Sequence, residues 1–368
     1  MIDFLRRDWA AFHPQELPKQ ERALHVGLLG VSDISYTRRP HHSRQHPPQS
    51  HHRRRRRQRP KRAQNYAKTH NIPVVHSSYQ ALLDDPTIDA VYNPLPNGLH
   101  YEWTMKALKA GKHKFLSLLD KPNIDQLHTT HHFPKGYFAP DNIRFNYDVA
   151  GAALINFGYY NVQLLRQAFG QEPEECMEID VRLTQTGKGD QRIDEAFSAK
   201  WRFPNGGVGT IEADLVAMSG FWLTSWMPAI RSPMCEVKHR EVTVLETALE
   251  GKQHVKTRTV TVWNSGLPSF WHRIDVVDDH VIRNAPDGKV EKKGSEREHV
   301  KAYQGDVGDA SWMSYRHQLE QFVNRVRGRE SAGVWIDAED SVRQMEMIDS
   351  AYQKAGLPVR PGSTYEGS

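Results

Sequence analysis

Residues 148–160 read Asp148-Val-Ala-Gly-Ala-Ala-Leu-Ile-Asn-Phe-Gly-Tyr-Tyr160, and they carry the most information in this 368-residue chain. We expect a helix that begins near Ala150 and continues through Phe169. Gly151 and Gly158 fit close contact between that helix and a sheet, because glycine has no Cβ. The stretch therefore predicts a helix lying on one face of a sheet.

Alternation of apolar and polar residues with a period of two dominates the chain after this helix. The expected strands are Met177 to Leu183, Ala196 to Phe203, Gly207 to Leu215, Val237 to Leu245 and Val255 to Trp263. Between the second and third of them, Pro204-Asn-Gly-Gly is a strong hairpin signal. The pattern predicts a mostly antiparallel sheet, followed by helices over 311–327 and 337–355.

The part of the chain before the helix alternates short strands with helices. Strands are expected at His25 to Gly30, Ile72 to His76 and Ala90 to Asn93, and helices at Lys61 to Lys68, Ser78 to Leu83 and His100 to Ala110. Such alternation predicts a parallel, doubly wound sheet. Residues 1–22 are expected to form an arm packed on the body by Trp9 and Phe12.

A glycine-containing segment, Gly27-Leu-Leu-Gly-Val-Ser-Asp-Ile-Ser35, follows the first expected strand. Glycines at such a place allow a tight turn and bring a pyrophosphate close to a helix N-terminus. The segment indicates a dinucleotide site that uses Gly27, Gly30, Ser32, Asp33 and Ile34. The alternative is a strand that simply ends in a glycine turn.

Residues 36–58 form an irregular basic insert, rich in Pro, His and Arg, in which Pro40, Pro47 and Pro48 forbid a regular helix. The second strand of the sheet, which should carry the ribose-selecting residue, has no counterpart. Eleven Lys or Arg residues and no Asp or Glu lie between Arg38 and Arg62, and the rest of the chain has 38 basic against 44 acidic residues. The pronounced basic character thus belongs to one segment.

Three interpretations of this insert compete. It could be an arginine cluster that selects the 2'-phosphate of NADP, or a patch for nucleic acid or another polyanion. The third, which we favour, is family coding sequence translated in a shifted frame. Few aromatic residues accompany the run, so nucleic-acid binding is not expected. Its clustered histidines are not expected to form a metal site, because no rigid element presents them.

Cysteine content and hydropathy indicate the cellular environment in which the chain is expected to fold. Only Cys176 and Cys235 are present, which excludes a disulfide framework and a thiolate zinc site. No apolar run reaches membrane-spanning length, and the first residues lack the apolar core of a signal peptide. We expect a cytoplasmic protein with no membrane contact.

The stretch 148–160, together with Asn93-Pro-Leu-Pro-Asn-Gly-Leu-His100, resembles a known enzyme family. It is the glucose-fructose/inositol dehydrogenase (Gfo/Idh/MocA) type of two-domain NAD(P)-dependent oxidoreductase, in particular its dihydrodiol dehydrogenase and D-xylose dehydrogenase branch. The resemblance covers about residues 23–35, 60–113 and 115–360. It implies an α/β fold: a Rossmann-like dinucleotide-binding domain over 23–120 and a substrate and dimerisation domain with a large, mostly antiparallel sheet over 121–360.

The resemblance also implies an activity and partners. The expected reaction is hydride transfer between NADP or NAD and a secondary alcohol of a sugar-like or trans-dihydrodiol substrate. A homodimer would form through the C-terminal sheet. In the family the turn at 93–100 lies under the nicotinamide ribose, which implies cofactor contacts from Asn93, Pro94, Pro96, Asn97 and His100.

The catalytic residues implied by the resemblance are Tyr160 and Lys121. Tyr160 stands where the family has a general acid/base, although Asn156 replaces the Asp one helical turn before it. A tyrosine with its ordinary pKa near 10 needs a nearby cation to act at neutral pH. Lys121, in Asp120-Lys121-Pro122, imitates the family's Glu-Lys-Pro motif. However, Phe115 to Asp120 resembles a helix that normally comes later, so Lys121 is expected to be a mimic on a surface turn after loss of the true lysine.

Two rivals to a working dehydrogenase follow from these departures. One is a catalytically impaired relative that keeps the substrate domain but has a defective cofactor site. The other is a polyanion-binding protein that uses the basic insert.

Overall fold

The computed structural model describes residues 25–28, 60–69, 72–77, 81–82, 84–92, 118–185, 189–218, 234–244, 251–265, 273–300, 320–325, 327–329 and 338–361. The expected arm at 1–22, the insert at 36–58 and the helix at 100–110 lie outside these residues, as does most of the helix expected at 78–83. In the described ranges no helix combines the length and the apolar character needed to span a membrane.

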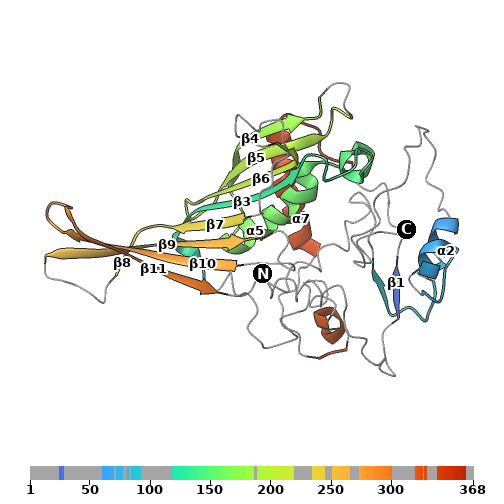
Figure 1. Cartoon of the computed structure of the whole chain (residues 1–368), viewed down its shortest axis with the longest axis horizontal. Helices are drawn as coiled ribbons and strands as arrows, with labels where there is room; N and C mark the ends of the chain where they lie inside the picture. Colours follow the sequence, from blue (N-terminus) through green and yellow to red (C-terminus); the bar gives the residue numbers. More distant parts are fainter. Residues whose placement is uncertain are drawn as a thin grey trace.

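The N-terminal part contains a two-stranded parallel sheet with a helix beside it (Figure 1). Strand β1 (Val26–Leu28) pairs with β2 (Ala90–Tyr92) in the register Val26 to Ala90. Helix α2 covers Pro60–Thr69, which confirms the helix expected at 61–68. The parallel pairing agrees with a Rossmann-like domain.

The strand expected at Ile72 to His76 is wrong, because this segment pairs with no strand in the part of the chain that the structure describes. The backbone N–H of Ile72 donates to the carbonyl of Ala67 at 2.9 Å and closes the end of α2. Pro73 has no N–H to offer a neighbouring strand. Val74 and Val75 are 59% and 44% exposed, so their β-branched side chains do not enter a core.

A large mixed sheet forms the C-terminal part, in the strand order β11-β10-β9-β7-β3-β6-β5-β4, with β8 paired to β9. Strand β3 pairs parallel with β6, and every other pairing is antiparallel. The strands are β3 (Ile124–Pro134), β4 (Glu175–Leu183), β5 (Asp194–Arg202), β6 (Val208–Ala217), β7 (Met234–His239), β8 (Val242–Thr243), β9 (Lys252–Trp263), β10 (Arg273–Asn284) and β11 (Val290–Val300). The mostly antiparallel sheet is therefore confirmed.

The expected strands are found within a few residues, with one interruption. The strand expected at Val237 to Leu245 divides into β7 and β8, because the Arg240 backbone N–H turns to the Asn123 carbonyl at 2.7 Å. The hairpin at 204–207 joins β5 to β6, and Gly206 supplies its left-handed residue, with φ of 76°. Glycine adopts that conformation without steric penalty.

Two helices cover one face of the large sheet (Figure 1). A π-helical turn η7 (Leu154–Gly158) continues directly into α5 (Tyr159–Phe169), and α7 (Ala338–Lys354) packs beside it. The helix starts a few residues after the expected Ala150, because Ala150 is left-handed with φ of 57°. Of the helix expected at 311–327, the described part 320–325 is helical.

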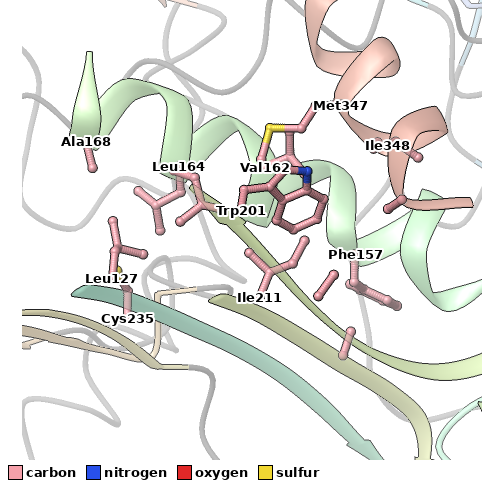
Figure 2. Packing of buried hydrophobic residues seen from close by; sticks show 14 of the residues in the cluster. Leu127, Phe157, Val162, Leu164, Ala168, Trp201, Ile211, Cys235, Met347 and Ile348 are labelled. Carbon is pink, nitrogen blue, oxygen red and sulfur yellow. The ribbon is translucent and has the colours of Figure 1, made fainter. Parts of the chain in front are cut away.

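The core lies between these helices and the sheet. Figure 2 shows Val162 of α5 and Met347 of α7 close to the indole of Trp201 in β5, with Ile211 of β6 beneath them. Trp201 and Val162 are fully buried. Burying side chains of this size typically stabilises a fold by about 1.5–3 kcal/mol each. This packing sets the position of α5 on the sheet, and with it the position of Tyr160.

Candidate active site

Tyr160 is the second residue of α5 and stands directly after the π-helical turn. Tyr160 is 38% exposed, so part of the residue is open to solvent. Tyr159 packs edge-on against it, with ring centroids 5.9 Å apart. Burial, followed by the neighbouring Tyr160, raises the pKa of the Tyr159 phenol above its ordinary range. Tyr159 therefore stays protonated at neutral pH, and Tyr160 is the accessible phenol of the pair.

A buried carboxylate holds the helical turn before Tyr160. Asp194, at the start of β5, accepts hydrogen bonds from the Leu154 backbone N–H at 2.7 Å and from the Tyr352 hydroxyl at 3.0 Å. The guanidinium of Arg360 pairs with the same carboxylate, and both side chains are almost fully buried. Removing one partner of such a pair leaves an uncompensated buried charge. The network therefore ties the helix start to β5, α7 and the C-terminal segment.

Helix α7 also fixes α5 through polar contacts. The Gln344 side chain donates to the Tyr159 carbonyl at 2.6 Å. Arg166 of α5 is buried and pairs with Glu172 at 2.5 Å and Asp340 at 2.9 Å. The backbone of the catalytic candidate thus rests on a rigid support.

Four rings form an aromatic cluster near Tyr160: Phe133, Tyr137, Phe138 and Phe157. Phe133 lies near the end of β3 and is 4.4 Å from Phe157, between ring centroids. Tyr137, in the turn after β3, is 61% exposed. The aromatic cluster therefore runs from the buried helix face out to solvent.

Arg144 enters this cluster from the short 3-10 turn η5 (Ile143–Phe145). Its guanidinium carbon is 4.5 Å from the Phe138 ring centroid and 5.5 Å from that of Phe157. Its Nη1 donates to the Asn142 side chain at 3.1 Å. Burial lowers the pKa of the guanidinium, whereas the phenols of Tyr160 and Tyr137 raise it. Arg144 is thus a cation of the aromatic cluster that lies within electrostatic range of Tyr160.

Lys121 lies at the other end of α5. It begins the 3-10 turn η4 (Lys121–Asn123) just before β3, and its Nζ is 3.1 Å from the position that a Cβ on Gly170 would take. Gly170 caps the C-terminus of α5 in a left-handed conformation, with φ of 68°. Ten residues of helix separate Tyr160 from Gly170, a rise of roughly 15 Å. The structure does not bring Lys121 and Tyr160 together.

The sheet gives an independent measure of this separation. Phe169, at the end of α5, stacks on Phe203 at 3.9 Å, beside the start of β6. Phe157, before α5, meets Phe133 at the end of β3. Because β3 and β6 are parallel, α5 runs against both, and Lys121 and Tyr160 lie toward opposite ends of β3. The nine residue steps from Ile124 to Phe133 correspond to about 30 Å of extended strand.

Hydrogen bonds fix the turn that carries Lys121. Asn205, in the β5–β6 hairpin, donates to the Lys121 carbonyl at 3.3 Å. The Asp120 backbone N–H donates to Nε2 of His239 at 3.1 Å, so Nδ1 carries the proton and donates to the Arg258 carbonyl at 3.0 Å. Burial lowers the pKa of His239, which keeps its imidazole neutral. This turn is therefore built into the sheet, away from Tyr160.

The predicted cofactor residues are mostly outside the described part of the chain. Gly27 is buried in β1, where a Cβ would come within 2.6 Å of the Leu82 side chain. The other predicted contacts outside the described residues are Gly30, Ser32, Asp33, Ile34, Asn93, Pro94, Pro96, Asn97 and His100. Both predicted cofactor segments follow directly from β1 and β2, whose carboxyl ends share one edge of a parallel sheet. Dinucleotides bind at that edge in doubly wound folds, so this arrangement fits NAD(P).

Sequence reasoning did not find Arg144, Asp194 or the aromatic cluster. The residue before η5, Asn142, accepts from the Arg144 backbone N–H at 3.1 Å, and an Asn before a short helical turn is a recognisable signal for the turn. No pattern marks the guanidinium itself. In the described part of the chain, no group of three or more His, Cys, Asp or Glu could hold a metal ion.

A parallel sheet of the Rossmann type, followed by a large mostly antiparallel sheet covered by helices, is the arrangement expected of a two-domain NAD(P)-dependent oxidoreductase. Family models agree in both parts. One, described as an oxidoreductase family with an NAD-binding Rossmann fold, matches residues 24–128, and the GFO/IDH/MocA C-terminal domain matches 123–229. Together they cover more than half of the chain, which belongs to the Gfo/Idh/MocA oxidoreductase family.

Individual relatives match at lower identity. The chain is 25% identical over 342 residues to D-xylose 1-dehydrogenase (NADP(+)) 2 of Haloferax volcanii, covering 80% of this chain and 86% of that protein. It is 36% identical over 62 residues to trans-1,2-dihydrobenzene-1,2-diol dehydrogenase of Xenopus tropicalis, covering 17% of this chain and 18% of that one. The crystal structure of a 3-ketoreductase from Actinomadura kijaniata, with NADP and TDP-benzene, shares the fold with a TM-score of 0.57. That match covers 90% of this chain and 97% of the other at 15% identity.

Proposed function

We propose that the chain transfers hydride between NADP or NAD and a secondary alcohol of a sugar-like or trans-dihydrodiol substrate. The observation that carries this proposal is the position of Tyr160, exposed at the start of a rigidly held helix. Membership of the oxidoreductase family and the activities named for the two relatives support it. Residues 23–120 would hold the cofactor, and residues 121–360 the substrate.

Tyr160 handles the proton in this proposal. When the substrate is oxidised, Tyr160 acts as a phenolate whose oxygen accepts the proton of the reacting hydroxyl, and when a carbonyl is reduced, the neutral phenol donates that proton back. The nicotinamide ring supplies or accepts the hydride when NAD(P) is bound. Gly27 of β1, the residues Gly30, Ser32, Asp33 and Ile34 that follow β1 in the sequence, and Asn93 to His100, which follow β2, would hold it.

The exposed rim of the aromatic cluster favours a ring-bearing substrate. Tyr137 presents a ring to solvent, and Phe133 and Phe138 extend the apolar surface toward Phe157. Aromatic faces pack against the apolar faces of sugar and diol rings, whose hydroxyls point outward. A cyclic polyol therefore suits this surface better than a linear one.

A substrate panel tests the proposal directly. D-xylose, other aldoses and trans-1,2-dihydrobenzene-1,2-diol would be offered with NADP and with NAD, and nicotinamide reduction followed by absorbance. Turnover that disappears in Tyr160→Phe and survives in Tyr159→Phe is the expected result. Tyr159 is a matched control, because it neighbours Tyr160 but is largely buried. Turnover that is equal in both variants would contradict the role of Tyr160.

A catalytically impaired relative is the second candidate, and the position of Lys121 favours it. With Lys121 held near Gly170, the Lys–Tyr pair implied by the family resemblance is not formed. The absence of a sequence match for the second Rossmann strand points the same way. Calorimetric titration with NADP and NAD separates the candidates: micromolar binding supports the enzyme, and no binding supports the impaired relative.

We also propose a cytoplasmic homodimer formed through the large sheet. The face of the sheet away from α5 and α7 carries cross-strand charge pairs such as Arg182 with Asp214 at 2.7 Å and Lys200 with Glu178 at 2.6 Å. Because this face carries charges of both signs, it offers partners to the same face of a second copy across a two-fold axis. Light scattering coupled to size-exclusion chromatography tests it, and a monomeric mass at working concentration would contradict it.

A further inference from the structure

Arg144 combines three properties that ordinary surface arginines lack. Its guanidinium lies over the rings of Phe138 and Phe157. Its Nε is buried and makes no hydrogen bond, while Nη1 is held by Asn142. An arginine placed over aromatic faces keeps its charge, because the ring quadrupole attracts the cation. The side chain is therefore a fixed positive charge rather than a mobile one.

This charge lies beside the tyrosine because of the helical spacing. Phe157 and Tyr160 are three residues apart across the junction of η7 and α5, so both side chains project from neighbouring positions of one helical face. The π-helical turn that carries Phe157 is fixed by Asp194. A group held over Phe157 is thus held next to Tyr160.

Other charged or titratable groups lie around this part of η7 and α5. His131 of β3 stacks on Phe157, with ring centroids 6.1 Å apart. Tyr159 packs against Tyr160 from the same helix, and Tyr137 faces Arg144 from the turn after β3. Asp340 of α7 and Arg166 of α5 act on Tyr159. Of these, Arg144 is the cation that lies over Phe157, three residues before Tyr160, and a positive charge there favours an ionised phenol.

We propose that Arg144 is a positioning residue for Tyr160 and replaces the family lysine as the cation that favours its ionised phenol. The inference rests on the proposed role of Tyr160 as general acid/base. The guanidinium attracts the phenolate oxygen, so the phenol loses its proton more readily. The lysine motif at 120–122 is then dispensable, and the site has its cation from a different element.

Nuclear magnetic resonance of the full-length protein with isotope-labelled tyrosine tests this inference without any need for turnover. The Tyr160 signal is assigned by its loss in Tyr160→Phe and titrated with pH. In the unmodified protein we expect Tyr160 to ionise below the ordinary tyrosine value of about 10. Arg144→Met should raise that midpoint by about one unit, and Arg144→Lys by less, because lysine keeps the charge.

Arg192→Met is the matched control. Arg192 lies over another tyrosine, Tyr147, at 4.1 Å, and pairs with Asp190 at 2.6 Å. Its removal should leave the Tyr160 midpoint unchanged. An Arg144→Met protein that is folded by circular dichroism and shows an unmoved Tyr160 midpoint would overturn the proposal.

A salt titration covers the case in which Arg144→Met does not fold. In the unmodified protein, a midpoint lowered by a partly exposed charge should rise toward about 10 as salt is added. A Tyr160 midpoint at or above about 10 at low salt would overturn the inference. These readouts separate the inference from the proposed activity. A lowered Tyr160 midpoint without turnover would support the Arg144–Tyr160 pair and contradict the dehydrogenase activity. Turnover with an ordinary midpoint would support the activity and contradict the pair.

Discussion

The two ends of α5 differ in how they acquire a cation. At the C-terminal end, Lys121 carries the sequence motif of a catalytic lysine but lies against Gly170, where the helix carbonyls end. At the N-terminal end, Arg144 has no motif and lies among the rings next to Tyr160. A helix C-terminus is a favourable place for a cation for structural reasons alone. The cation that carries a motif therefore lies at the C-terminal end of α5, whereas the cation in the aromatic cluster carries none.

The largest expected effect is a difference in enzyme activity between variants at the two ends of α5. Tyr160→Phe should reduce kcat/KM by about 10²–10⁴, because proton transfer by a placed side chain contributes that much. Lys121→Met should change kcat/KM by no more than about twofold, since Lys121 lies at the far end of α5. Steady-state kinetics on the best substrate of the panel measure both. A loss in Lys121→Met as large as that in Tyr160→Phe would break the comparison.

The second effect concerns the support of the N-terminal end. Asp194→Ala should destabilise the protein by about 3–5 kcal/mol, because it leaves Arg360 buried without its partner. Urea unfolding followed by circular dichroism measures the change. Asp190→Ala removes an ion pair with Arg192 that is partly exposed, and should change stability by no more than about 1 kcal/mol. Equal losses in the two variants would show that the buried network does not hold the helix start.

A third test disturbs the packing of the turn that carries Arg144 against the segment that leads into η7. A Cβ at Gly151 would overlap the carbonyl oxygens of Ile143, Arg144 and Asn146, which are backbone atoms and cannot rotate away. Gly151→Ala should therefore destabilise the protein by about 1–3 kcal/mol. It should also weaken any activity that depends on Tyr160. Gly294→Ala is the control, because a Cβ there meets nothing within 4 Å; thermal unfolding of the two variants gives the comparison.

The smallest expected effect is a pH dependence of protein stability, which tests the contacts at the C-terminal end of α5. Burial lowers the pKa of His239 in the folded protein, so the unfolded chain binds a proton more readily. The stability that neutral His239 contributes is therefore present above the unfolded pKa of about 6.5 and is lost as pH falls below it. His239→Gln should lower stability by about 1 kcal/mol at neutral pH and by less in mild acid. Urea unfolding at several pH values would contradict this if the difference between the two proteins were constant.

The sequence predicted most of the regular elements of the sheet and its helices because their patterns are local. The hairpin at 204–207, strands β4, β5, β6 and β9, and helices α2 and α7 follow their apolar periodicity or turn residues. Strand β11 escaped prediction because ten of its eleven residues are exposed, so no buried face imposes an alternation. Strand β3 was missed for the opposite reason: adjacent polar residues, Thr129 and Thr130, are both buried within it.

The site was only partly predictable. Tyr160 was found from its place in a motif, and its exposure at the start of α5 is compatible with the predicted role. Lys121 was also found from a motif, and no local pattern reports that η4 is tied to the β5–β6 hairpin and to His239. The position of Arg144 depends on aromatic rings from β3, from the turn after β3 and from η7. These rings come together only in the folded chain. Tertiary neighbours of this kind leave no periodic trace.

Strand β3 has a consequence for the order in which the molecule assembles. On one side of it β4, β5 and β6 are successive antiparallel neighbours, and on the other β9, β10 and β11 are, so each group can form early from contacts between nearby residues. Strand β3 must then join β6, from Gln126 to Val208, and β7, from Thr129 to Cys235, across long intervening segments. Long-range and parallel pairings form slowly, so β3 closes the sheet late. Until then the edges of β6 and β7 are open to strands of other chains, and this interval is when the protein is most exposed to misassembly during synthesis.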